Sequence, residues 1–214
     1  MARRTAKQSQ QASASGSTNK PAPAKQATSD PSSYPKQSGN WLKHNHLCFG
    51  GKNRQSDPNA NFLSNFYPAP FELDGIQHYH VEGAFQAAKY LDLSEEGRSP
   101  TYARRIAETK DPAEAKRLGR QKRLSAEDVK TWQEGGAEAA MRKAIAAKFA
   151  QGSELAAKLL DTGDRVLVEA TRDKLWGAVK GVGKNKLGVI LMERRAQLAE
   201  KQREDVDARS AAQE

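Results

Sequence analysis

The sequence predicts a mainly α-helical single domain of the α+β class, with a small β component and a disordered N-terminal tail before it. Apolar residues recur at helical spacing through the second half of the chain, and capping residues precede most of these segments. Two short segments have the composition of strands. We expect a basic tail over 1–40, one folded domain over 41–200 and a polar C-terminal tail over 201–214.

The first 40 residues differ in composition from the rest of the chain. They carry six Lys and Arg residues against one acid, a net +5 of the +9 carried by all 214 residues. They contain no Val, Ile, Leu, Phe or Trp and four of the nine prolines. Such a segment buries too little apolar surface to offset its ordering entropy. Its charge suits contact with nucleic acid or another polyanion, and a solvated arm without a partner explains it at least as well.

The β component is expected at two places. The aromatic, proline-rich stretch over 46–75 excludes long regular elements, but Phe71–Leu73 followed by Asp74 and Gly75 predicts a short strand and a turn. The apolar run 166–168 predicts a buried strand in the C-terminal half.

Helix starts are marked by capping residues. An apolar stripe at i, i+4 and i+7 predicts a helix over 80–91. Asp111 precedes a proline and stands three residues before Glu114, which is the spacing of a capping box. The glycines at 135–136 predict a break or kink in the helical stretch 125–150. The other expected capping residues are Ser99, Ser125, Ser153 and Asn185.

Several classes of protein are excluded by composition. No run approaches the roughly 20 apolar residues of a membrane span, and the N-terminus lacks the apolar segment of a secretory signal. Cys48 is the only cysteine, which excludes a disulfide framework and fits a reducing compartment. We therefore expect a cytoplasmic protein, with the nucleus or an organelle as alternatives. The pairs His44 and His46, and His78 and His80, match no zinc spacing, so no metal is expected.

A glycine-rich loop over 177–185 resembles phosphate-binding loops in composition. Its glycines lack the Walker spacing, and Asn185 follows Lys184 where a magnesium-binding Ser or Thr would stand. The backbone amides of this loop, which contains Gly177 and leads into a helix N-terminus, still suit the binding of an anion. A flexible connection between strand and helix is an equal alternative.

Two segments carry side chains suited to catalysis. Glu82, Gln86 and Lys89 share one helix face, which is either an exposed Glu–Lys face or the wall of a site. Asp173 and Trp176 follow Glu169 at a strand end.

A carboxylate beside an indole suits a flat ligand. Alternatively, Asp173 caps backbone amides and Trp176 fills the core.

Long sequence blocks, collinear over about residues 46–198, resemble the NADAR superfamily, the YbiA-like proteins. The blocks are FLSNFYPAPFELDG, YHVEGAFQAAKY, DPAEAKRLGR, KFAQGSELAAKLLDTGDRVLVEATRDKLWG and GVGKNKLGVILMERR, with Trp132 and Met141 between the third and the fourth. The resemblance implies a mostly helical α+β fold and an N-glycosidase activity that needs no metal or redox cofactor. Gly83 departs from the family, which usually has His or a larger residue there, and this bears on substrate choice.

The resemblance, which covers Glu82, Asp173 and the aromatic positions, and the residue patterns above together give roles to individual residues. Glu82 is the expected essential carboxylate and Asp173 the second group, because cleavage of a C1′–N bond builds positive charge that a nearby carboxylate stabilises. Lys89 either binds a phosphate as a cation or forms an imine with ring-opened ribose. The expected substrate-binding residues are Asn65, Phe66, Tyr67, Gln86, Trp132, Trp176, Gly177, Lys184 and Asn185.

Three functions remain open at this point. The first is hydrolysis of a small nucleotide-like substrate, an early riboflavin-pathway ribosylaminopyrimidine phosphate above all. The second is removal of ADP-ribose from guanine bases, which the basic tail favours. The third is a non-catalytic module that binds ADP-ribose or a related nucleotide, and the presence of both Glu82 and Asp173 argues against it. The sequence does not predict an oligomeric state.

Overall fold

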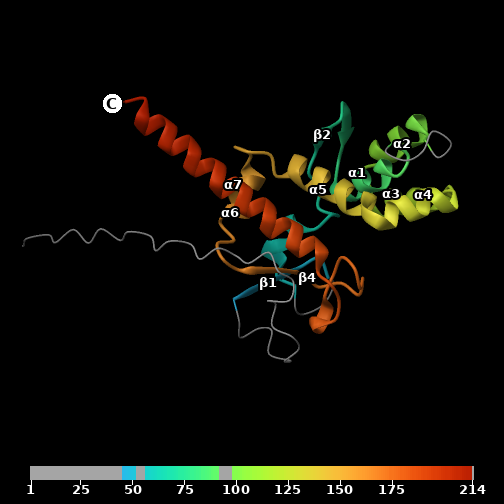
Figure 1. Cartoon of the computed structure of the whole chain (residues 1–214). Coiled ribbons are helices and arrows are strands. Elements are labelled where there is room, and N and C mark those ends of the chain that lie inside the picture. The colour runs from blue at the N-terminus through green and yellow to red at the C-terminus, as the bar shows by residue number, and fades with distance from the viewer. Residues whose placement is uncertain (1–44, 52–55, 92–97, 214) are drawn as a thin grey trace, which may run out of the picture.

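The computed structural model of the chain describes residues 45–51, 56–91 and 98–213, and the tail predicted over 1–40 lies outside them. The described part is mainly helical with a few short strands, so the predicted fold class is confirmed. Helices α1 to α5 and the hairpin containing β2 lie on one side of the molecule, and strands β1 and β4 lie on the other (Figure 1).

Two strands far apart in sequence form a parallel pair. β1 (His46–Phe49) runs beside β4 (Val166–Glu169), with Leu47 opposite Leu167. β4 confirms the strand predicted from the apolar run. β1 was missed because it has only four residues inside a stretch read as irregular.

A hairpin forms the second small sheet. β2 (Phe71–Leu73) pairs antiparallel with β3 (Ile76–His78). Asp74 and Gly75 connect them with φ values of 51° and 71°, the left-handed pair that a two-residue hairpin turn requires. This strand and turn were predicted.

The helices follow the expected order. They are α1 (Val81–Ala88), α2 (Pro100–Ala107), α3 (Pro112–Gln121), α4 (Ala126–Thr131), α5 (Ala137–Lys148), α6 (Glu154–Leu160) and α7 (Lys186–Ala211), with 3-10 turns η3 (Pro58–Leu63) and η5 (Val179–Gly181) and the π-helical turn η4 (Trp132–Gly136).

Three predicted helix caps are confirmed. Asp111, Ser125 and Ser153 each accept a hydrogen bond from a backbone amide in the first turn of their helix. The predicted capping box does not close, because Glu114 binds Arg117 of its own helix instead, at 2.6 Å.

Two other predicted capping residues stand at the expected positions but do not cap their helices through their side chains. Ser99 and Asn185 stand at the N-cap positions of α2 and α7 but make no capping bond with their side chains. Asn185 has a φ of 51°, and its amide is engaged with β4. The kink predicted at the glycine pair is confirmed at Gly135, where the chain passes through η4 before α5 continues.

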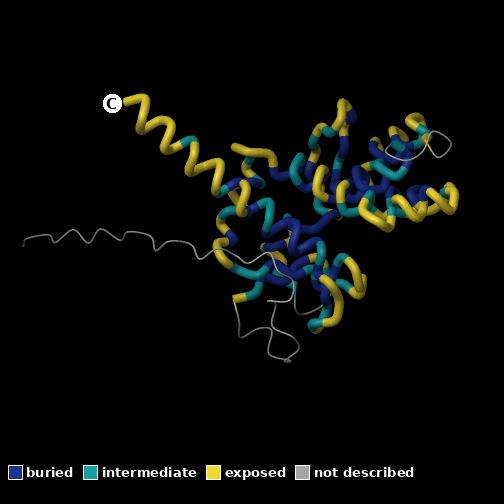
Figure 2. The backbone as a smooth tube through the Cα atoms, in the orientation of Figure 1, coloured by how far each residue is buried: buried dark blue, intermediate teal, exposed yellow. Residues whose placement is uncertain are grey.

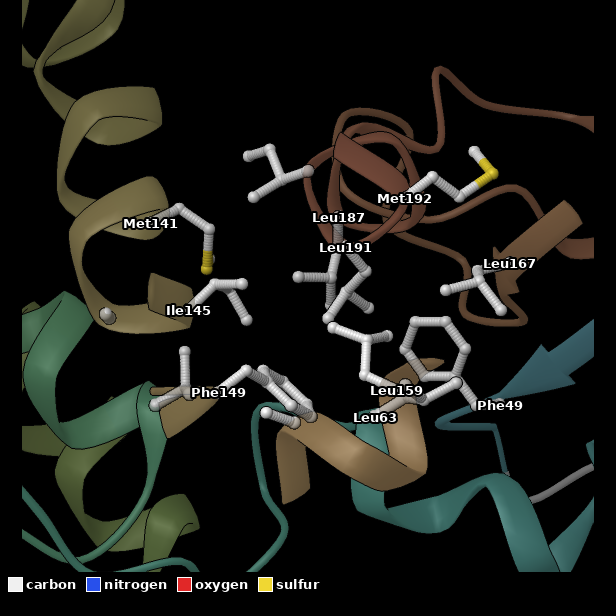
Figure 3. Packing of buried hydrophobic residues seen from close by; sticks show 14 of the residues in the cluster. Phe49, Leu63, Met141, Ile145, Phe149, Leu159, Leu167, Leu187, Leu191 and Met192 are labelled. Carbon is white, nitrogen blue, oxygen red and sulfur yellow. The ribbon is translucent and has the colours of Figure 1, made fainter. Parts of the chain in front are cut away.

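The main core lies between α5, α7 and the parallel strands. Met141, Ile145 and Phe149 lie on the α5 side and face Leu187 and Leu191 of α7 across the core (Figure 3). A second cluster of buried residues holds α1, α2 and α3 together. α1 contacts both clusters, so its polar face is held between two packed units.

The C-terminal helix is longer than the sequence predicted. Residues 201–211, expected as a polar tail, continue α7, which projects from the body and is mostly exposed there (Figures 1 and 2). Lys201 pairs with Glu204 within the helix, and Gln151 donates a hydrogen bond to Asp205 at 2.7 Å. These contacts support a helix that lacks an apolar face. Across the three described ranges, no helix has the length and apolarity of a membrane span.

Candidate active site

The polar face of α1 is buried, not exposed. Glu82 is only 5% exposed, and its Oε1 accepts a hydrogen bond of 2.8 Å from Gln86 Nε2. Gln86 Oε1 in turn accepts a bond of 2.7 Å from Lys89 Nζ. The three side chains therefore form one hydrogen-bonded chain along the helix. Of the two readings that the spacing left open, burial favours the wall of a site.

Helix α3 packs directly against this face. Lys116 Nζ lies 3.8 Å from Glu82 Oε1, and Lys89 Nζ donates to the carbonyl of Gly119 at 3.3 Å. A Cβ on Gly119 would lie 2.1 Å from Gln86 Oε1, so only glycine permits this approach. On α3, Lys116 thus lies beside the Glu82 carboxylate, and Gly119 lies beside both Gln86 and the Lys89 amine.

The start of α1 is fixed by its own capping residue. His80 Nδ1 accepts a hydrogen bond of 2.8 Å from the Gly83 amide, and Asn65 O accepts one of 3.1 Å from the Glu82 amide. A Cβ on Gly83 would lie 3.0 Å from the His80 ring. Gly83 is therefore the residue that leaves room for this histidine cap.

Lys89 lies between aromatic rings. Its Nζ is 5.9 Å from the ring centroid of Phe85 and 5.7 Å from that of Trp132. Burial lowers the pKa of Lys89 to about 8 against the opposing charge of Glu82, and the cations Arg120 and Lys116 contribute to the decrease. An amine in this state is closer to deprotonation at neutral pH than an exposed lysine.

An aromatic cluster borders this amine. The Phe85 ring lies 5.2 Å from that of Trp132 and 5.5 Å from that of Trp176, measured between centroids. Both tryptophans are half-buried, so each keeps a surface that a ligand can reach. Phe66 is 40% exposed, and its ring centroid is 5.6 Å from Lys116 Nζ. The cluster thus supplies faces on which a planar base can stack.

The end of β4 brings a second carboxyl group to the site. Burial, together with the negative charges of Asp173 and Glu82, raises the pKa of Glu169 to about 7 against the opposing charge of Lys116. Asp173 itself is exposed, and its Oδ1 accepts hydrogen bonds of 2.9 Å from the amides of Leu175 and Trp176. Asp173 therefore makes the contacts of the second alternative given above, in which it caps backbone amides.

The glycine-rich loop holds β4 against α7. Asn185 donates to the carbonyl of Leu167 at 2.8 Å and accepts from the Glu169 amide at 3.0 Å. The carbonyl of Gly177 accepts from the Asn185 amide at 3.1 Å, and the side chain of Lys184 is exposed. These three predicted binding residues lie at the junction that positions Glu169.

The aromatic-proline segment is divided between two places. Asn65 is buried, donates to Met141 Sδ at 3.5 Å, and its Oδ1 has no hydrogen-bond partner among the described residues. Tyr67 lies beside Lys148, with 5.4 Å from Nζ to the ring centroid. It lines a different pocket, of about 440 Å³, between η3 and the end of α6. Of this segment, only Asn65 and Phe66 contact residues of the α1–α3 site.

The site contains three groups that the sequence analysis did not assign. Lys116, Gly119 and Arg120 have i, i+3 and i+4 spacing and share a face of α3, but that spacing also describes an ordinary solvated face. Across the described ranges, no three His, Cys, Asp or Glu side chains form a group that could hold a metal ion.

Trp176→Ala tests the stacking surface. We expect the KM to rise about tenfold or more with a small change in kcat, because stacking on a base contributes roughly 1–3 kcal/mol and is made before and during the reaction. Steady-state kinetics with a melting curve would measure it. Loss of the folded state in this variant would assign Trp176 to the core, where it packs on Phe85.

Fold and site together have the features of an enzyme, since their groups suit acid–base or nucleophilic chemistry. A buried carboxylate, an amine of lowered pKa and stacking rings meet on one side of α1.

Comparison with known proteins identifies the family. A family model described as the NADAR domain matches residues 51–199. The N-glycosidase YbiA of Escherichia coli strain K12 is 42% identical over 146 residues, which are 67% of this chain and 84% of that protein. An N-glycosidase of Nostoc punctiforme is 32% identical over 142 residues, 64% of this chain and 84% of that protein.

Two further matches agree. A riboflavin biosynthesis protein of Vibrio vulnificus is 34% identical over 149 residues, 68% of this chain and 38% of that protein. The NMR structure of E. coli YbiA has a TM-score of 0.56 and 35% identity, covering 78% of this chain and 95% of that one. The chain belongs to the NADAR domain family, and it is an N-glycosidase, a hydrolase acting on N-glycosyl compounds.

Proposed function

We propose that this enzyme hydrolyses the bond between C1′ of ribose and the nitrogen of a ribosylated base, with early riboflavin-pathway ribosylaminopyrimidine phosphates as its substrates. The observation that carries the proposal is the buried Glu82, held by Gln86 and Lys116 beside an aromatic cluster. The names of the relatives, N-glycosidases and a riboflavin biosynthesis protein, support the same substrate class.

Glu82 stabilises the transition state in this proposal. Departure of the base leaves positive charge on the ribose, and a carboxylate fixed near C1′ interacts with that charge more strongly than with the neutral substrate. Gln86 holds the Glu82 carboxylate in place. Phe66, Trp132 and Trp176 stack on the base, and the cations Lys116 and Arg120 on α3 attract the phosphate of the substrate.

The experiment is a product assay on the purified full chain. The enzyme is incubated in parallel with a ribosylaminopyrimidine phosphate, ADP-ribosylated guanosine and NAD, and released base is identified by mass. Release from the first substrate alone supports the proposal. Release of guanine or guanosine from the second supports the alternative function, removal of ADP-ribose, which the positively charged α3 and the basic tail favour.

No release from any substrate, together with measurable binding of ADP-ribose, would defeat both enzymatic proposals. It would leave a binding module in which Glu82 contacts the ligand. If guanine release is seen, deletion of residues 1–40 tests the tail. Loss of action on a polymer but not on the free nucleotide would assign the tail to recognition of nucleic acid.

Lys89 offers a direct test of mechanism. Its lowered pKa and its place between Phe85 and Trp132 favour a nucleophile that adds to C1′ of ring-opened ribose, expels the base and leaves an imine for water to hydrolyse. We expect borohydride to trap this imine as a stable adduct on Lys89, detected by peptide mass, and Lys89→Arg to give none. An active enzyme that gives no adduct would assign Lys89 to electrostatic binding of the phosphate instead.

A further inference from the structure

Glu169 occupies a fixed position at the carboxyl ends of the parallel strands. Its amide donates to Asn185 Oδ1 at 3.0 Å, so the first turn of α7 holds its backbone in place. Its side chain lies against the end of β1, since a Cβ on Gly50 would lie 3.4 Å from Glu169 Cγ. Asn185 thus fixes the backbone of Glu169, and the absence of a side chain at Gly50 leaves room for its carboxyl group.

Glu169 is half-buried, and the Oε2 atom of its carboxyl group lies inside the protein. Neither this oxygen nor Thr171 Oγ1 has a partner with hydrogen-bond geometry among the described residues, although the nearby Thr171 hydroxyl lowers the pKa of Glu169 slightly. Both side chains lie beside Gly50, within 4 Å of the place its Cβ would take. Leaving such an atom unpaired costs about 1–3 kcal/mol, so an unpaired buried oxygen requires an explanation, such as a bound water or a catalytic role.

The charges around Glu169 belong to the site already described. Asp173, Glu82 and Lys116 all influence it, from the loop after β4, from α1 and from α3 respectively. Burial and the two carboxylates raise the pKa of Glu169 to about 7, against the pull of Lys116. These surroundings favour the protonated form of Glu169 more than those of an ordinary exposed carboxyl group do.

Asp173, which the sequence analysis predicts as the second catalytic group, has surroundings that differ from those of Glu169. It is exposed, and its Oδ1 is occupied by the amides of Leu175 and Trp176. Its negative charge acts on Glu169, so it is a positioning residue for Trp176 and an electrostatic neighbour of Glu169.

We propose that Glu169 is the general acid of the reaction, and that it donates its carboxyl proton to the nitrogen that leaves the ribose. The inference rests on the proposed N-glycosidase function. As the C1′–N bond breaks, its electron pair passes to the nitrogen, and the proton of Glu169 neutralises it. Water, or the Lys89 amine followed by water, then bonds to C1′, and the proton released returns to the Glu169 carboxylate.

The test is the dependence of kcat/KM on pH in the full-length enzyme and two isosteric variants. A general acid must be protonated, so the wild-type rate should fall as the pH rises through about 7. In Glu169→Gln we expect kcat to fall by about 10²–10⁴ and this alkaline limb to disappear. The titration of Lys89 remains in that variant, so the limb that disappears belongs to Glu169.

Asp173→Asn provides the matched control. Asparagine retains an oxygen for the two amides, but the negative charge that raises the pKa of Glu169 is lost. The alkaline limb should therefore move to lower pH, which a purely structural role of Asp173 would not cause. A titration of the Glu169 carboxyl carbon by NMR would locate the same shift without measuring activity.

The two proposals fail differently. No release of base by the wild-type enzyme from any ribosylated substrate defeats the proposed function and this inference with it. An active wild-type enzyme whose alkaline limb persists unchanged in Glu169→Gln defeats the inference alone. An Asp173→Asn variant that loses activity at every pH without moving the limb would make Asp173 the second catalytic group.

Discussion

Replacing Glu82 with Gln should lower the turnover number by at least about 10² while the protein remains folded, since that is the usual range for loss of one acid–base or charge-stabilising group. The substitution keeps the shape of the side chain and an oxygen that can accept the bond from Gln86 Nε2. What it removes is the negative charge that the proposed mechanism places near C1′. The KM should change much less, because the stacking surfaces on Phe66, Trp132 and Trp176 are untouched.

The measurement combines initial rates, read as released base by mass, with a thermal melt. Glu72→Gln is a matched control, because Glu72 is an exposed carboxylate on β2, away from the α1 face. We expect it to behave as wild type in both assays. A wild-type rate in Glu82→Gln would remove Glu82 from the mechanism and leave Glu169 as the candidate for its role.

Most of the fold follows from local sequence signals. The strand at Phe71–Leu73, its turn and the helix starts at Asp111, Ser125 and Ser153 each depend on residues close together in the chain. Predictions from local sequence patterns were wrong where a structure depends on a partner that is distant in the sequence. β1 exists because β4, about 120 residues later, pairs with it. Asn185 occupies a cap position, but its side chain binds β4 instead.

The helical extension at the C-terminus shows a different limit. Residues 201–211 lack an apolar stripe. For that reason the sequence predicted that the last helix ends before them. Pairs such as Lys201 with Glu204, and the contact between Gln151 and Asp205, hold the helix there without burial. Hydrophobic periodicity detects helices that pack, and it misses one that continues beyond the body of the domain.

In the candidate site, too, some features could be predicted from local sequence and others depend on tertiary packing. Glu82, Gln86 and Lys89 could be grouped from their spacing, because they share one helix. Spacing alone could not decide whether that face was exposed. The answer depends on α3, because Gly119 of that helix packs closely on Gln86. This contact joins two helices that are about 30 residues apart, and no local sequence pattern predicts it. The choice between Asp173 and Glu169 is of the same kind, since burial and hydrogen-bond partners distinguish two carboxylates four residues apart.

Gly119→Ala should therefore have the second large effect. In a helix interior alanine normally stabilises by about 1 kcal/mol relative to glycine. Here the new Cβ would lie 2.1 Å from Gln86 Oε1 and 2.8 Å from Gln86 Cβ, in a buried contact. Forcing atoms into a packed interface costs about 1–3 kcal/mol, so we expect a net loss of stability in denaturant unfolding. Activity should fall as well, since displaced Gln86 no longer joins Glu82 to Lys89.

A double-mutant cycle separates this clash from a general weakening of α3. In Gln86→Ala the amide that meets the new methyl group is gone, and only the Cβ contact at 2.8 Å remains. Adding Gly119→Ala to that background should cost less than it costs in the wild type, with a coupling energy of about 0.5–3 kcal/mol. Activity should remain low in both variants, because each lacks the bridge between carboxylate and amine. Equal costs in the two backgrounds would mean that α1 and α3 do not meet at this glycine, and the site would lose the packing that buries Glu82.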